Sequence, residues 1–247
     1  MQDRYAGDIG DFGKLGLLRA LNAAGLSIGV NWYRTTPLAS ELTRDDGRYR
    51  IPKNLFHCDV ELAKALFEIS QSDNPERSVK ALEEAKLIDG AVYFSELVRI
   101  ADRLEWHREA MTTLRCCDLV FLDPDNGLLV KSVSPNSARS VKYALYEEVG
   151  KYVAAGKSAV IYNHRCRKKW DVYAQFITEQ LRLKSNLLNN PIRAITFPRF
   201  SVRDYFIISA TPEHDQRIQS ALGFIENSVW NRSGLCTKSV ILKNAIT

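Results

Sequence analysis

The sequence predicts an α/β domain built on a doubly wound, Rossmann-like and mostly parallel sheet. Segments with strand and helix character alternate along the chain, which favours a parallel sheet with right-handed crossover helices. The apolar run of residues 118–123 (DLVFLD) is typical of a parallel strand covered on both faces. Near the carboxyl end, two strand-like segments are joined only by residues 199–203 (RFSVR), so we expect an antiparallel hairpin at the edge of the sheet.

The amino-terminal half contains segments of helix and strand character on either side of a long polar stretch. Apolar residues recur at helical spacing in residues 13–25, and the glycine at the end suits a helix stop. Residues 27–33 are rich in β-branched and aromatic side chains and predict a strand. Residues 34–54 predict a long loop, which in a compact domain is often functional. The elements expected next are helices at 59–70, 78–88 and 102–115 and a short strand at 91–97.

The carboxyl-terminal half continues the alternation. Its expected elements are the strand 118–123, helix 138–156, strand 158–164, helix 170–185, strands 192–198 and 204–211, and helix 214–230. No internal repeat and no Pro/Gly/Ser-rich linker divides the chain. We therefore expect a single domain of residues 1–247, with a helical insertion or subregion at about 37–110.

Composition indicates a globular protein of ordinary type. Hydrophobic residues make up 45% of the 247 residues, which is enough to fill a sizeable core. The net charge of +5 is a mild basic excess that permits a polyanionic partner without requiring one. Five cysteines without CxxC spacing favour reduced thiols. The absence of a signal peptide and of a long apolar run predicts a cytoplasmic location with no membrane partner, and no oligomeric state is indicated.

A polar cluster directly follows the strand 118–123. Asp123 and Pro124 end the strand, and Asp125, Asn126 and Gly127 favour a turn. Ligands of open α/β sheets bind beyond the carboxyl ends of the strands, so Asp123, Pro124, Asp125 and Asn126 are candidate catalytic residues. The alternative is a structural turn in which Asp123 caps the next element.

A second cluster, Gly7, Asp8, Gly10, Asp11 and Lys14, precedes and opens the first predicted helix. Glycines let backbone amides approach a ligand, and a helix amino terminus adds favourable positive charge. The spacing matches neither the dinucleotide-binding fingerprint nor a Walker A loop. The alternative is a helix cap at a flexible amino terminus.

These motifs together resemble the bacterial 23S ribosomal RNA adenine-N6 methyltransferase family. The resemblance consists of G-D-x-G-D-F-G-K before a helix, a central strand ending in D-P-D-N, and a terminal strand pair. Residues 5–24 match the family's amino-terminal segment, residues 118–127 its D-P-P-Y/F motif, and residues 141–225 the helix, strand, helix and hairpin that follow. The resemblance implies a methyltransferase-like sheet ending in an antiparallel strand, with S-adenosylmethionine as methyl donor and an adenine amino group of nucleic acid as acceptor.

The resemblance also implies residue roles. Asp123 and Pro124 would hold the target amino group, through the carboxylate and a backbone carbonyl. Asp125 or Asn126 would take the place of the residue that stacks on the base. The donor pocket would be formed with the help of Gly7, Asp8, Gly10, Asp11 and Lys14.

The sequence departs from the family at two places. Asp125 and Asn126 stand where the family has its second proline and its stacking aromatic residue. Residues 30–40 (VNWYRTTPLAS) lack the D-x-x-A-G-x-G loop that accommodates the methionine part of the donor. The chain therefore either binds the cofactor differently or keeps the fold without methyl transfer.

The densest basic run follows the predicted strand 158–164. His164 ends that strand and is a further catalytic candidate. The basic residues that could bind nucleic acid are Arg165, Arg167, Lys168 and Lys169 beside Trp170, together with Arg199 and Arg203 in the terminal hairpin. Cations beside an aromatic ring can neutralise phosphates and stack a base, although a short basic run is also typical of a solvated loop.

Two other functions stay open from the sequence. Asp8, Asp11, Asp123 and Asp125, with Asp45, Asp46 and His164 nearby, could bind a divalent cation in a metal-dependent nuclease or phosphohydrolase. A non-catalytic nucleic-acid-binding module on a degenerate methyltransferase fold is the third possibility, and it predicts a filled donor pocket. The histidines and cysteines show no zinc-binding spacing, so no metal ligands are assigned.

Overall fold

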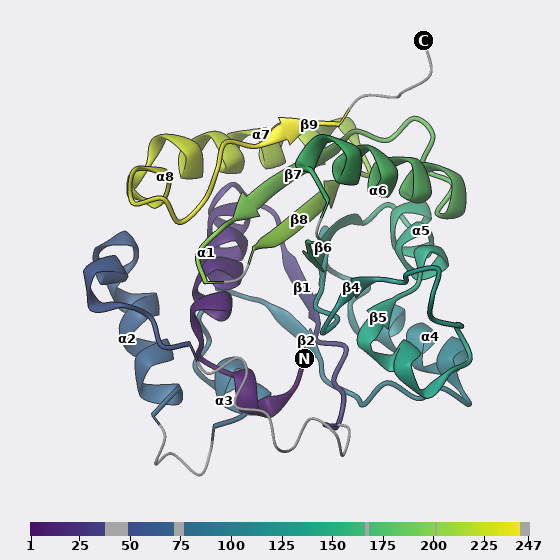
Figure 1. Cartoon of the computed structure of the whole chain (residues 1–247), viewed down its shortest axis with the longest axis horizontal. Helices are drawn as coiled ribbons and strands as arrows, with labels where there is room; N and C mark the ends of the chain where they lie inside the picture. Colours follow the sequence, from purple (N-terminus) through teal and green to yellow (C-terminus); the bar gives the residue numbers. More distant parts are fainter. Residues whose placement is uncertain (38–48, 72–76, 166–167, 201, 243–247) are drawn as a thin grey trace.

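The protein has an α/β fold with one seven-stranded mixed sheet, seen in the computed structural model in Figure 1. The structure describes residues 1–37, 49–71, 77–165, 168–200 and 202–242. The strand order is β2-β1-β3-β6-β8-β7-β9. This arrangement confirms the predicted α/β class and is compatible with a Rossmann-like sheet.

One half of the sheet is parallel. It consists of β2 (Val92–Phe94), β1 (Ile28–Asn31), β3 (Leu119–Leu122) and β6 (Ser158–His164). β2 follows β1 on one side, whereas β3 lies on the other side of β1. The register places Asn31 beside Leu122, so the carboxyl ends of β1 and β3 meet. Such a change of direction is a topological switch point, where open α/β sheets bind their ligands.

The other half is antiparallel. β8 (Arg203–Ile208) pairs with β6 on one side and with β7 (Ile192–Phe197) on the other, and both pairings are antiparallel. A short strand, β9 (Val240–Ile241), adds to β7 and forms the edge. The expected edge position of the β7–β8 pair is therefore wrong, because the chain returns and covers β7.

Buried side chains alternate between the two faces of the sheet and form a hydrophobic core on each. On β3, Leu119 and Phe121 belong to one core, whereas Val120 and Leu122 belong to the other. The first core is covered by α1 (Ile9–Ala23), α2 (Val60–Ile69), α3 (Val79–Glu84), α7 (Pro212–Asn227) and α8 (Val229–Arg232). The second is covered by α4 (Arg103–Thr113), α5 (Tyr146–Ala154) and α6 (Trp170–Lys184).

Short elements complete the described chain. They are the 3-10 helices η1 (Asp3–Tyr5), η3 (Lys53–Cys58) and η4 (Ala138–Lys142), and a small parallel pair of β4 (Gly127–Leu128) and β5 (Tyr143–Ala144). Cys58, Cys116, Cys117 and Cys236 are free thiols in the described residues.

Two of the differences from the expected elements have a clear structural cause. α1 begins at Ile9 because the Asp8 carboxylate accepts a hydrogen bond from the backbone of Asp11 and caps the helix. The expected helix 138–156 is α-helical only in α5, since its first part forms η4 and pairs as β5 with β4. Within range 37–110, the expected strand 91–97 contains β2, which joins the main sheet beside β1.

Candidate functional site

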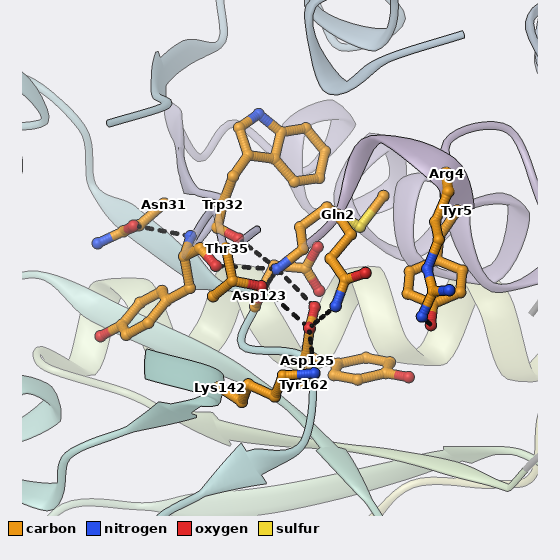
Figure 2. Close-up of polar contacts among 12 residues, drawn as sticks. Gln2, Arg4, Tyr5, Asn31, Trp32, Thr35, Asp123, Asp125, Lys142 and Tyr162 are labelled. Atoms are coloured by element: carbon orange, nitrogen blue, oxygen red, sulfur yellow. Dashed lines mark hydrogen bonds and ion pairs between the residues drawn. The ribbon is translucent and has the colours of Figure 1, made fainter. Parts of the chain in front are cut away.

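The candidate site lies at the switch point, where the chain leaves β1 and β3. Figure 2 shows side chains from the first residues, from the end of β1 and from the end of β3 meeting around Asp125. Asp123 follows the last residue of β3 and is buried. The predicted location of the polar cluster beyond β3 therefore matches the geometry of the sheet.

An ammonium group is held at the centre of the site. The amino group of Met1 donates to the backbone carbonyls of Trp32 at 3.1 Å, Tyr33 at 2.9 Å and Asp123 at 3.2 Å. It also forms an ion pair with Asp125 Oδ1 at 2.9 Å. We call these three carbonyls and the Asp125 carboxylate the ammonium receptor. Its acceptors come from both strands of the switch point.

The second oxygen of Asp125 is held by side chains. Asp125 Oδ2 accepts hydrogen bonds from Gln2 Nε2 at 2.8 Å and from Thr35 Oγ1 at 3.1 Å, and Lys142 Nζ lies 3.7 Å from it (Figure 2). Burial alone raises the pKa of Asp125, but the ammonium group and the Gln2 hydrogen bond outweigh it and lower the pKa to about 2. Asp125 is therefore a permanent anion at neutral pH.

Asp123 is bound on its side-chain end by a lysine. Lys14 Nζ lies 2.6 Å from Asp123 Oδ2 and 2.9 Å from Asp11 Oδ1, and all three side chains are buried. Burial alone lowers the pKa of Lys14, but the two carboxylates raise it well above its usual value. The Asp123 carboxylate is thus neutralised from inside the protein and is not open to a ligand in this conformation.

Asp8 and Arg203 extend the cluster toward the β7–β8 turn. Arg203 lies 3.9 Å from Asp8 Oδ2 and donates to the Tyr162 hydroxyl at 3.2 Å. That hydroxyl also contacts His164 Nε2 at 2.9 Å. Burial, and after it the Asp11 carboxylate, raises the pKa of Asp8 to about 7. His164 therefore joins the predicted amino-terminal cluster through Tyr162 and Arg203.

The turn after Asp125 is fixed by Asn163. Asn163 Oδ1 accepts a hydrogen bond from the backbone of Leu128 at 2.7 Å. Gly127 has φ +103°, and a Cβ there would lie 1.9 Å from Asn163 Oδ1. Only glycine fits this position. Pro124 is buried and Asn126 is exposed, so the two share the turn but not the same surroundings.

The amino-terminal glycines are packed against protein atoms. A Cβ at Gly7 would lie 2.7 Å from the carbonyl oxygen of Leu66, and one at Gly10 would lie 2.9 Å from the Arg203 guanidinium. Close packing therefore accounts for both glycines without a ligand.

The predicted basic residues do not form one exposed patch. Arg165 pairs with Asp204 and lies over the Trp170 ring at 4.5 Å, and Arg203 is buried beside Asp8. Lys168 and Lys169 are exposed before α6. Arg199 donates to the carbonyls of Ser233 and Gly234 in a separate part of the surface. Arg167 lies outside the described residues.

No group of three or more His, Cys, Asp or Glu side chains suited to a metal ion is found in the described part of the chain. Lys14 instead lies between Asp11 and Asp123, where a shared cation would have to bind. Asp45 and Asp46, the other acidic candidates, lie outside the described residues.

Bulky residues follow β1 where the family has its glycine-rich loop. Trp32 and Tyr33 are fully buried, and Tyr33 has φ +46°, a conformation that a bulky residue rarely adopts. Tyr33 donates through its hydroxyl to Glu148 at 2.9 Å. Strained backbone of this kind is concentrated at functional sites.

Sequence reasoning missed most partners of Asp125. Met1, Gln2, Thr35 and Lys142 belong to segments with no chemical motif, so nothing local marks them. Tyr162 could have been found, since it lies two residues before His164 on β6 and therefore points to the same face.

In the described part of the chain, no helix has the length and apolar character that crossing a membrane requires. The sequence matches no protein-family model and no curated protein. Among solved structures, the protein LPL1258 from Legionella pneumophila str. Philadelphia 1, described under the family-model DUF519, is similar to this chain at 11% identity. The similarity covers 98% of this chain and 99% of that chain with a TM-score of 0.45, which is too low to indicate a function.

Proposed function

We propose that this protein is an S-adenosylmethionine-dependent methyltransferase for an amino group in nucleic acid, built on the doubly wound, methyltransferase-like sheet that the family resemblance implies. The ammonium receptor carries the proposal. Its three carbonyls and the Asp125 carboxylate converge on an ammonium group at the switch point. The amino-acid part of S-adenosylmethionine bears such a group, so its amino end fits these acceptors.

The indole of Trp32, the residue after β1, carries an unsatisfied donor. Its Nε1 is buried and has no hydrogen-bond partner among the described residues. A buried donor without a partner is costly. A ligand acceptor that reaches Trp32 Nε1 would remove that cost.

The bound donor would supply the methyl group. Asp125, which stays ionised, would orient the donor's amino end, with help from the carbonyl of Asp123. Lys14 holds the Asp123 carboxylate, so in this conformation Asp123 positions its own carbonyl and does not accept hydrogens from a target amino group. Trp32 and Tyr33 are fully buried, and their side chains would limit the access of water to the receptor.

Donor binding requires the amino-terminal segment to move. Met1 and Gln2 occupy the receptor, so the apparent affinity is reduced by the fraction of molecules in which they are displaced. A hydrogen bond to a charged group contributes about 1.5–3 kcal/mol, so Gln2→Ala should tighten donor binding by about 10-fold or more.

Calorimetric titration of S-adenosylmethionine tests the proposal. We expect saturable binding by the native chain, tighter binding by Gln2→Ala, and at least about 10-fold weaker binding by Asp125→Asn, because the charge that meets the ammonium group is lost. Asp89→Asn, at an exposed position, is the matched control and should bind as the native chain does. If neither the native chain nor Gln2→Ala binds the donor, the proposal is wrong.

A second candidate is a nucleic-acid-binding module without catalysis. The full burial of Trp32 and Tyr33 favours it, because bulky side chains stand where the resemblance implies the glycine-rich loop for the methionine part of the donor. This candidate would be supported if neither the native chain nor Gln2→Ala binds the donor.

A further inference from the structure

An exposed aromatic pair lies at the same end of the molecule as the candidate site. Tyr49 and Phe200 are 48% and 55% exposed, and their rings stack with centroids 5.6 Å apart at an interplanar angle of 26°. They come from distant segments, Tyr49 from the chain before η3 and Phe200 from the turn between β7 and β8. Two stacked rings that stay open to solvent leave an aromatic surface available to a third ring.

The backbone holds Phe200 in an unusual conformation. Its φ is +64°, a left-handed value that is costly for a bulky residue. The turn gains no burial from this, since the ring remains exposed. Strain that produces exposure of an aromatic ring points to a role for the ring outside the protein's own packing.

Basic residues adjoin the pair in the chain. Lys53 is exposed and follows Tyr49 by four residues. Arg199 precedes Phe200 and donates to the backbone carbonyls of Ser233 and Gly234, which carry no net charge, so these bonds leave its positive charge in place. An aromatic face among cations fits an unpaired base flanked by phosphates.

Two contacts connect the pair to the candidate site. The carbonyl of Tyr49 accepts a hydrogen bond from the backbone of Ile9 at 2.9 Å, at the start of α1. Arg203, at the end of the Phe200 turn, lies 3.9 Å from Asp8, the cap of the same helix. Figure 1 shows the end of β7 and the start of β8 beside α1, where Phe197 and Arg203 lie against Gly13 and Gly10.

We propose that Tyr49 and Phe200 form a stacking platform for an unpaired base of single-stranded nucleic acid, with Lys53 and Arg199 as the cations that contact its phosphates. The platform implies that the acceptor of the proposed methyltransferase is single-stranded, and this part of the inference rests on the proposed function. Its binding of nucleic acid needs no methyl donor, so the two proposals fail separately.

Fluorescence anisotropy with a labelled single-stranded oligonucleotide of mixed sequence tests the platform. We expect Phe200→Ala and Tyr49→Ala each to weaken binding by about 5-fold or more, as loss of one base–aromatic stack does. Phe200→Trp, which keeps an aromatic ring, should bind the oligonucleotide as the native chain does. Phe224→Ala is the matched control, because Phe224 is 68% exposed on α7. Binding of the corresponding duplex should be unaffected by Phe200→Ala.

The platform is overturned if the native chain does not bind the oligonucleotide, or if Phe200→Ala and Phe224→Ala bind it equally. Donor titration of Phe200→Ala separates the two proposals. If Phe200→Ala binds the donor normally and its oligonucleotide binding is unaltered, the platform is rejected and the methyltransferase proposal stands. If Phe200→Ala loses oligonucleotide binding and the native chain binds no donor, the platform is retained and the methyltransferase is rejected.

Discussion

At the scale of single residues, Asp8 links the candidate site to pH. Burial and the neighbouring Asp11 raise its pKa to about 7 from 3.8. The folded state therefore holds this proton at pH values where the unfolded chain has lost it. Its contribution to the free energy of unfolding is most favourable below about pH 4 and is lost as the pH rises toward 7.

Asp8→Asn should remove that dependence, because asparagine also caps helices and carries no charge. We expect the variant's gain in stability over the native chain to be larger at pH 8 than at pH 5, by a few kcal/mol at most. Urea unfolding at the two pH values measures this, with Asp59→Asn, at the cap of α2, controlling for the exchange of a capping residue. An equal difference at both pH values would contradict the assignment.

Lys14 is the residue on which the buried charges depend. Lys14→Met leaves the carboxylates of Asp11 and Asp123 buried without their counter-charge, and breaking such a pair costs about 3–5 kcal/mol. Lys80→Met removes an exposed lysine that lies 3.4 Å from Glu84, so it should cost less than about 1 kcal/mol. Chemical unfolding of both variants compares the two, and similar losses would show that the Lys14 cluster adds nothing.

At the scale of elements, the short strand β4 depends on Gly127. Gly127→Ala should destabilise the protein more than Gly90→Ala, although both glycines have positive φ, of +103° and +62°. A Cβ at Gly90 meets nothing within 4 Å, so that variant isolates the backbone cost of about 1–2 kcal/mol. A Cβ at Gly127 also displaces Asn163 from Leu128. Equal losses on thermal unfolding would show that Asn163 moves without cost.

The elements were predictable where a local pattern decides them. Residues 118–123 carry a continuous apolar run, and β3 lies within them. Residues 138–145 contain acceptable helix formers, but β5 within them pairs with β4. This pairing joins two separate segments, so the periodicity of either segment does not predict it. β9 is exposed and short, so it has no hydrophobic pattern to reveal it.

At the scale of the whole molecule, the fold class and the location of the site followed from the order of elements. The charge pairing within the site did not. The sequence places Asp11, Lys14 and Asp123 in two motifs that both suit ligands, and only the packing of α1 beside the switch point joins them into an internal ion cluster. The sequence likewise offered two basic segments as nucleic-acid contacts, but folding pairs Arg165 with Asp204 and buries Arg203 beside Asp8.

The central position of β8 constrains how the protein is made. β6 and β7 leave the ribosome before β8, yet they lie on opposite sides of it. Until Arg203–Ile208 has been synthesised, β6 exposes one row of unpaired backbone groups over the part that β8 later covers. Unprotected strand edges of this kind invite pairing between chains. A nascent chain stalled before residue 203 is therefore prone to aggregate. The hazard ends once β8 has been synthesised and has paired with β6 and β7.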